Sequence, residues 1–93
     1  MTADEAQRLG LVSRVVPAAT LLSDARALAE DLSSKAPRAI EYIIEAVNRG
    51  LEAPFDQGQL LEAALFGLAA STDDMREGTR AFLEKRKPVF TGK

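Results

Sequence analysis

Apolar side chains recur every three to four residues over three stretches of the chain, the spacing that lines one face of an α-helix. The pattern predicts helices over about residues 20–34, 37–52 and 56–70. Pro37 suits the first turn of the second helix, and Gly50 and Pro54 mark its end. The apolar stripes are Leu21, Leu22, Ala25, Leu28, Ala29 and Leu32; Ile40, Ile43, Ile44, Val47 and Leu51; and Leu60, Leu61, Ala64, Leu65 and Leu68.

The beginning of the chain predicts a short helix and then a strand. Thr2 and Glu5 have the spacing of a capping box, and Gly10 suits the residue after a helix end. Residues 11–17 are rich in β-branched side chains and end at Pro17, which predicts one strand. No second strand is predicted that could pair with it, so we expect its partner in another part of a larger protein or in another chain.

The helix over residues 56–70 is apolar on nearly all sides, which predicts burial on more than one face. In a chain this short, the second face is expected to meet another subunit or a domain outside the chain. Glu62 is the only charge between Asp56 and Asp73. It could be a buried catalytic carboxylate or the partner of an arginine, and pairing is favoured because buried charges are normally paired.

A last helix is predicted from about Asp73 to the residues before Pro88, which cannot continue a helix. Gly78 is unusual inside this helix because glycine destabilises a helix interior. We therefore expect a neighbouring helix or a ligand to pack closely against it. Lys85 follows Phe82 by three residues, so the two side chains could flank one ligand.

The charges are distributed unevenly along the chain. Residues 80–93 hold five basic residues against one acidic, a net charge of +4; the whole chain carries −2, so residues 1–79 carry −6. A local anion site and a solvated helix end both fit this pattern, and residue types alone favour the solvated end. A nucleic-acid partner is not expected, because such surfaces usually show a basic excess over the whole domain and interleaved aromatic residues.

Composition removes several kinds of chemistry. The 93 residues include no cysteine and no histidine, which excludes Ser-His-Asp and Cys-His catalysis and argues against a metal site. An apolar fraction of 46% predicts a packed core. No apolar run approaches the roughly 20 residues of a membrane span, and no signal peptide is recognised, so we expect a cytoplasmic protein.

Three passages together resemble the enoyl-CoA hydratase/isomerase (crotonase) superfamily. Residues 2–17 are similar to its TAxEAxxxGLVxxVVP passage, and residues 36–40 (APRAI) to its APxAI helix start. Residues 73–88 are similar to its closing D-x-x-EG-x-x-AF-x-EKR-x-P. The passages occur in the family's order and spacing over nearly the whole chain.

The resemblance implies a mainly α fold of about five helices with one short strand, the C-terminal helical (trimerisation) part of a ClpP/crotonase fold. Residues 1–17 would be the helix-strand end of a core outside the chain, and residues 18–93 the segment for oligomerisation and for covering coenzyme A. The implied partners are an acyl-CoA and further copies of the chain, as a trimer or hexamer.

The resemblance also implies which residues bind. Phe82 and Lys85 match family positions that contact the adenine and phosphate end of coenzyme A, and Arg86 is a further phosphate contact. No residue matches a catalytic position, and no tightly bound cofactor is implied. We therefore expect contributions to assembly and coenzyme A contacts, with the hydratase or isomerase chemistry supplied elsewhere and no activity from this chain alone. The alternative is an independent, non-catalytic helical interaction module derived from the family.

Overall fold

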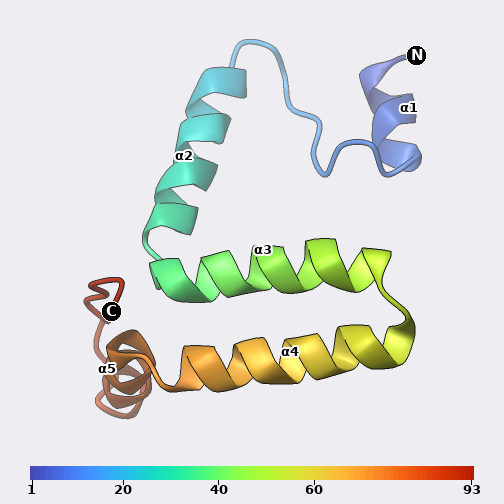
Figure 1. The fold of residues 1–93 in the computed structure, drawn as a ribbon. Helices are drawn as coiled ribbons and strands as arrows, with labels where there is room; N and C mark the ends of the chain where they lie inside the picture. The colour runs from blue at the N-terminus through green and yellow to red at the C-terminus, as the bar shows by residue number, and fades with distance from the viewer. The chain divides into compact units, whose positions relative to one another are not determined.

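A computed structural model describes all 93 residues and contains five helices (Figure 1). They are α1 (Ala3–Arg8), α2 (Leu21–Ser33), α3 (Pro37–Glu52), α4 (Phe55–Ala70) and α5 (Asp73–Leu83). The chain divides into two units, residues 1–32 and residues 33–93. The three long helices begin and end within one residue of the bounds predicted from apolar spacing.

The strand predicted over residues 11–17 is wrong. The structure contains no strand, and this segment is irregular. A strand needs a neighbouring strand to accept its backbone hydrogen bonds, and the chain supplies none. The first amide of the segment is already used, because the Leu11 N–H donates to the carbonyl of Ala6 at the end of α1.

The ends of α1 confirm the predicted capping. The Thr2 hydroxyl accepts from the Glu5 amide at 3.2 Å, and the Glu5 carboxylate accepts from the Thr2 amide at 2.7 Å. Gly10 has a left-handed backbone with φ +74°, and its N–H donates to Gln7. With the bond from Leu11, this is a complete Schellman motif, which satisfies carbonyl groups that a helix end otherwise leaves unpaired.

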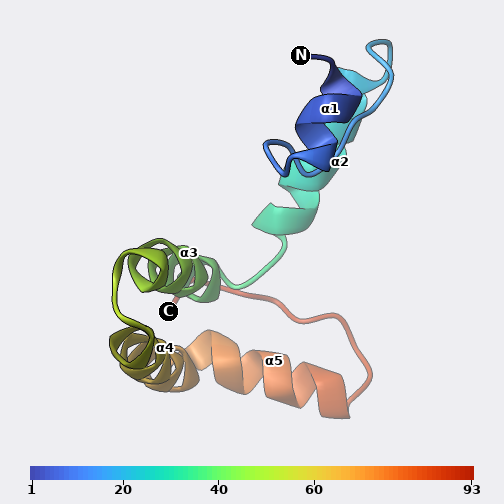
Figure 2. The same ribbon diagram turned by 90° about the vertical axis from the view of Figure 1, so that its right-hand side faces the viewer.

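In the second unit, α3 and α4 form an antiparallel helical hairpin, and α5 runs crosswise at its end (Figures 1 and 2). The two helices approach closely where α3 ends and α4 begins. A Cβ on Gly58 would lie 3.4 Å from the carbonyl oxygen of Gly50. The glycines therefore let the two backbones pack without intervening side chains.

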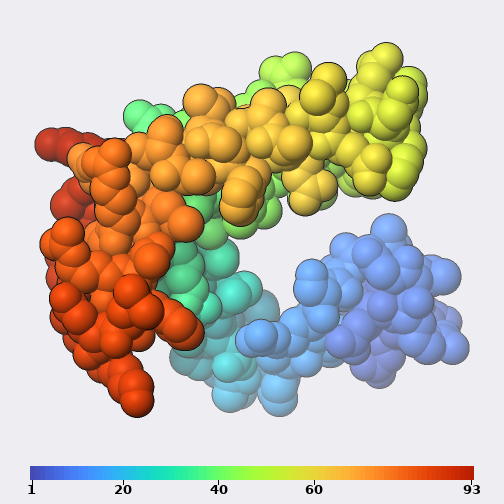
Figure 3. Space-filling view, turned by 90° about the horizontal axis from the view of Figure 1, so that it is seen from below, coloured from blue at the N-terminus to red at the C-terminus, as the bar shows by residue number.

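Very little of the chain is buried. The only buried apolar residues are Leu65 and Ala81, and the only buried polar residue is Asp74. The α4 side chains Leu60 and Phe66 are 72% and 71% exposed, and Figure 3 shows α4, yellow to orange, as an open ridge. The predicted stripes therefore form as helix faces but remain uncovered within the chain.

Glu62 also lies on the exposed surface of α4 and forms no ion pair, so the favoured pairing with an arginine is not realised within the chain. None of the five helices combines the length and the hydropathy needed to cross a bilayer.

Candidate functional site

The candidate site is built on α5, whose first turn is fixed by a side-chain cap. The Thr72 hydroxyl accepts from the Met75 amide at 3.1 Å, so this threonine is the N-cap. Asp73 and Asp74 follow in the first turn, where negative charge complements the helix dipole. Asp73 pairs with Arg76 on the surface, whereas Asp74 turns inward.

Asp74 anchors the last residues of the chain. Its carboxylate is 2% exposed and accepts from the backbone amides of Thr91 at 2.7 Å and Gly92 at 2.8 Å. Its own N–H donates to the Lys93 carbonyl at 3.1 Å. A Cβ on Gly92 would lie 3.6 Å from Pro37, so the end of the tail also meets the start of α3. Residues 84–93 therefore fold back along α5, as Figure 2 shows.

The end of α5 differs from the prediction. The helix ends at Leu83 with Glu84 as its C-cap, so Arg86 and Lys87 lie beyond it rather than in its last turn. Lys85 has a left-handed backbone with φ +53°. Its N–H donates to Phe82 at 3.2 Å, completing the second Schellman motif of the chain together with the bond from Arg86 to Ala81. This position normally holds glycine, and no other non-glycine residue of the chain has a positive φ.

Arg86 ties the tail to the exposed side of α5. Its guanidinium donates to both carboxylate oxygens of Glu77, at 2.6 and 3.0 Å, and to Glu84 at 2.6 Å. Glu77 also accepts from the Val89 amide at 2.9 Å. The hydrogen bond from Arg86, with that from Val89, lowers the pKa of Glu77 to about 2. The same carboxylates raise the pKa of Arg86 above its ordinary value.

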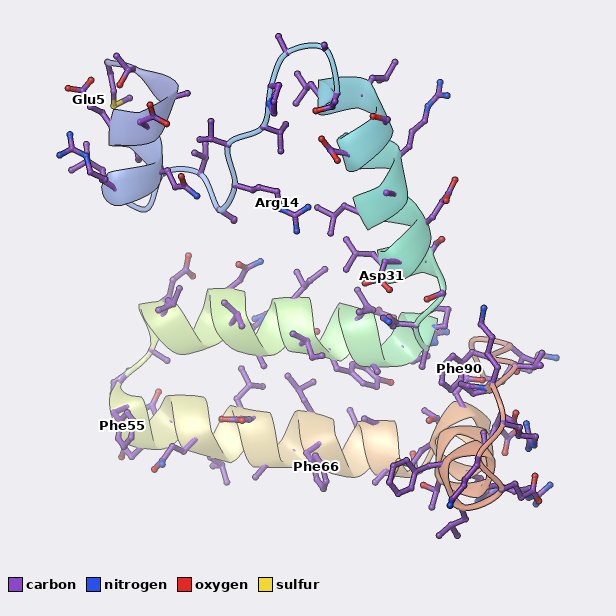
Figure 4. All side chains as sticks on the ribbon, turned by 180° about the vertical axis from the view of Figure 1, so that it is seen from behind. Glu5, Arg14, Asp31, Phe55, Phe66 and Phe90 are labelled. Atoms are coloured by element: carbon purple, nitrogen blue, oxygen red, sulfur yellow. The ribbon has the colours of Figure 1, made fainter.

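A neighbouring helix or a ligand was expected at Gly78, but the residue that lies there is Phe90 of the tail. A Cβ on Gly78 would lie 3.4 Å from a ring carbon of Phe90. Figure 4 shows Phe90 on the folded-back tail beside α5. At this distance a Cβ would make an ordinary van der Waals contact with the ring, so Phe90 packs against Gly78 without requiring a glycine there.

Phe82 and Lys85 present an aromatic ring and a cation at the end of α5. The Phe82 side chain is 82% exposed at the edge of an apolar hollow of about 410 Å³, formed by α5 with the start of α3 and the end of α4. Met75, Gly78 and Thr79 line the same hollow. Lys85 is exposed and forms no ion pair. An exposed ring can stack on a nucleotide base, and a free ammonium can bind a phosphate.

The Glu77 carboxylate is poorly suited to proton transfer. A general base works best with a pKa near the working pH, and the pKa of Glu77 lies far below neutrality. Glu84 is engaged by Arg86. No group of three or more acidic residues could hold a metal ion.

Phe82 lies in the last turn of α5 and Lys85 just beyond the C-cap, and both are exposed. Their contacts with coenzyme A stay predictions. The phosphate contact of Arg86 stays a prediction, since its guanidinium already holds two carboxylates. Sequence reasoning missed Asp74 as the tail anchor and Glu77 as the partner of Arg86. The Asp74 bonds join residues 17 and 18 positions apart across Pro88. The Glu77–Arg86 bond joins residues 9 positions apart across the turn at Lys85. Local spacing gives no signal for either.

The model of the enoyl-CoA hydratase/isomerase family matches residues 1–93. A probable enoyl-CoA hydratase of Mycobacterium bovis is 50% identical over 91 residues, which cover 98% of this chain and 35% of that protein. A crotonyl-CoA hydratase of Syntrophomonas wolfei is 41% identical over 93 residues, 100% of this chain and 36% of that protein. The chain therefore spans about a third of the length of these relatives.

Solved structures show the same similarity. An enoyl-CoA hydratase subunit from Geobacillus kaustophilus superposes with a TM-score of 0.93 at 42% identity, over 100% of this chain and 36% of that one. An enoyl-CoA hydratase from Bacillus anthracis gives a TM-score of 0.96 at 34% identity, over 100% of this chain and 36% of that one.

Proposed function

The chain belongs to the enoyl-CoA hydratase/isomerase family, and we propose that it supplies coenzyme A contacts and subunit assembly to an enzyme of that family that acts on acyl-CoA thioesters. Phe82 and Lys85 contact the adenine and phosphate end of coenzyme A, and Arg86 borders them. The catalytic groups and the oxyanion hole lie outside these 93 residues. In the whole enzyme the chain assembles as a trimer or hexamer.

The observation that carries the coenzyme A contact is the pairing of an exposed ring with an uncompensated cation. Coenzyme A offers an aromatic base and several phosphates, which match Phe82 and Lys85 respectively. The neighbouring acidic groups do not oppose the phosphates at full strength, because Arg86 binds both Glu77 and Glu84. The relatives named as enoyl-CoA and crotonyl-CoA hydratases supply the choice of ligand.

Titration of the ¹⁵N-labelled chain with coenzyme A tests the contact. We expect the amide signals of Phe82 and Lys85 to shift at millimolar ligand, and the shifts to weaken in Lys85→Gln. Arg76→Gln is the matched control, since it removes the same charge from the other end of α5, where Arg76 pairs with Asp73. Unmoved signals of Phe82 and Lys85, or equal weakening in both variants, would refute the contact.

The location of the catalytic groups is tested by activity. We expect the 93-residue chain to leave crotonyl-CoA unhydrated under conditions in which a full-length family enzyme consumes it. Hydration by the chain at a rate that depends on Glu62 would contradict the proposal, because Glu62 is the one carboxylate on the apolar helix α4 beyond its first turn.

A second candidate function is an independent helical module that assembles through α4. It is favoured by the exposed Leu60 and Phe66, which leave an apolar surface uncovered. We expect Phe66→Asp to lower the molar mass found by sedimentation, whereas Gln57→Asp, which places the same charge on a polar position of α4, leaves it unchanged. Leu65 is less suitable for this test because it is buried within the chain. An unchanged mass in Phe66→Asp would exclude assembly through this surface.

A further inference from the structure

Lys85 combines two features that are individually unfavourable. Its backbone is left-handed although its side chain carries a Cβ, which clashes with the backbone in that conformation. Its ammonium also forms no ion pair although Glu84 precedes it directly in the chain. Conformations of this kind persist only where the surroundings enforce them, and they occur most often at functional sites.

The surroundings that enforce the backbone conformation centre on Arg86. The Arg86 N–H donates to the Ala81 carbonyl at 3.0 Å, closing the turn that contains Lys85. The Arg86 side chain then returns to α5 and binds Glu77 through two parallel hydrogen bonds, at 2.6 and 3.0 Å. The main chain and the side chain of Arg86 are therefore both bonded to α5. Lys85 is held between Arg86 on one side and the end of the helix on the other.

The same contacts explain why the Lys85 ammonium is unpaired. Glu84 directly precedes Lys85 in the chain, Glu77 lies on α5, and the Arg86 guanidinium binds both. A guanidinium holds a carboxylate in a fixed, bidentate geometry that a flexible ammonium cannot match. Arg86 therefore occupies the carboxylate next to Lys85 in the chain and the carboxylate of Glu77, and neither pairs with Lys85.

We propose that Arg86, with Glu77, is a positioning residue for coenzyme A binding: it locks the turn at Lys85 and keeps the Lys85 ammonium available for phosphate. This inference rests on the proposed coenzyme A contact of Lys85. It assigns Arg86 a role that acts through Lys85 instead of a separate contact with the ligand. The two roles differ in whether the effects of changing Arg86 and Lys85 add.

The test compares Arg86→Gln, Lys85→Gln and the double variant, with Arg80→Gln as control. Arg80 lies on α5, is exposed and forms no ion pair. Its charge acts on Glu77 only at longer range, so its removal changes the net charge equally and leaves the hydrogen bonds of Arg86 in place. Without ligand, the backbone chemical shifts and scalar couplings of Lys85 report its φ angle. With coenzyme A as the probe, titration gives the affinity of each variant, and circular dichroism checks that each keeps its helices.

We expect Arg86→Gln to move Lys85 out of the left-handed region and to weaken coenzyme A binding about fivefold, as for loss of one exposed charge-assisted hydrogen bond. The double variant should bind coenzyme A about as tightly as the weaker-binding single variant, because both changes act on the same contact between Lys85 and phosphate. Adding Glu84→Gln to Arg86→Gln should restore part of the affinity, since the competing carboxylate is then absent. That recovery would not follow from a purely structural role.

Additive losses would overturn the inference and assign Arg86 a direct ligand contact. An unchanged Lys85 backbone with unchanged affinity in Arg86→Gln would overturn it too, while the coenzyme A contact itself stood. If Arg80→Gln lost as much affinity as Arg86→Gln, the effect would be one of net charge, and the inference would likewise be overturned. A wild-type chain that binds no coenzyme A would instead refute the proposed function, and the positioning role with it.

Discussion

Replacing Lys85 by glycine should stabilise the end of α5 while removing the cation proposed to bind coenzyme A. The left-handed backbone at φ +53° costs an L-residue about 1–2 kcal/mol, and glycine avoids this cost. Glycine also gains about 0.4–1 kcal/mol of conformational freedom in the unfolded chain, which offsets part of the benefit. The midpoints of the two ranges give an expected net gain of about 0.8 kcal/mol.

Hydrogen exchange of the Arg86 amide measures this gain locally, because that N–H closes the turn by donating to Ala81. A gain of this size should slow its exchange by about two- to fivefold. Lys85→Ala is the matched control: it removes the ammonium but keeps the Cβ, and should show no slowing. Faster exchange in Lys85→Gly, or equal slowing in both variants, would refute the reasoning that the backbone at Lys85 is strained.

Three further predictions concern the contacts along α5. Asp74→Ala should cost about 2 kcal/mol of stability in urea unfolding, because two backbone amides lose a buried charged acceptor; Asp73→Ala, which breaks an exposed pair, should cost less than about 0.5 kcal/mol. Folding lowers the pKa of Glu77 from its ordinary 4.5 to about 2. The contribution of this carboxylate to the free energy of unfolding is therefore complete above about pH 4.5 and is lost as the pH falls towards 2. Acid titration of Glu77→Gln should lack this transition. Gly78→Val should displace the Phe90 ring, because a Cβ would already lie 3.4 Å from it and the two methyl groups reach further; loss of nuclear Overhauser contacts between residue 78 and the Phe90 ring measures the displacement.

The helices were predictable because their information is local. The apolar period of α3 continues from Ile40 to Leu51, and Pro37 begins the helix in the structure as it does in the sequence pattern. The capping box of α1 needs only Thr2 and Glu5, three residues apart. Periodicity and caps are properties of neighbouring residues, and tertiary contacts did not override them here.

The strand was not predictable from the same kind of information. The β-branched composition of residues 11–17 indicates that an extended conformation is tolerated, but a strand also needs a partner. The packed core expected from the apolar composition also depends on a partner that covers the helices. Apolar composition favours burial, yet Leu60 and Phe66 are exposed because no element of the chain covers that side of α4.

The candidate site was predictable only in part. The spacing of Phe82 and Lys85 predicts neighbours one helical turn apart, but the helix ends at Leu83 and Lys85 lies in the left-handed turn beyond it. The contacts of Arg86 could not be predicted, because the chain leaves the helix at Lys85 without the glycine that usually signals such a turn. A helix continued to Pro88 would direct Arg86 along α5, whereas the actual turn brings it back to Glu77.

The bond between Asp74 and the tail has a consequence for the order in which the molecule matures during translation. Because the ribosome makes the chain from its N-terminus, the Asp74 carboxylate emerges 17 and 18 residues before the two amides that bind it. A nascent chain can therefore form α3, α4 and α5 while the start of α5 is still an open, acidic end. A chain that terminates between Pro88 and Thr91 would contain every helix but lack the hydrogen bonds between Asp74 and the tail. A measurement of helical content would not reveal this defect.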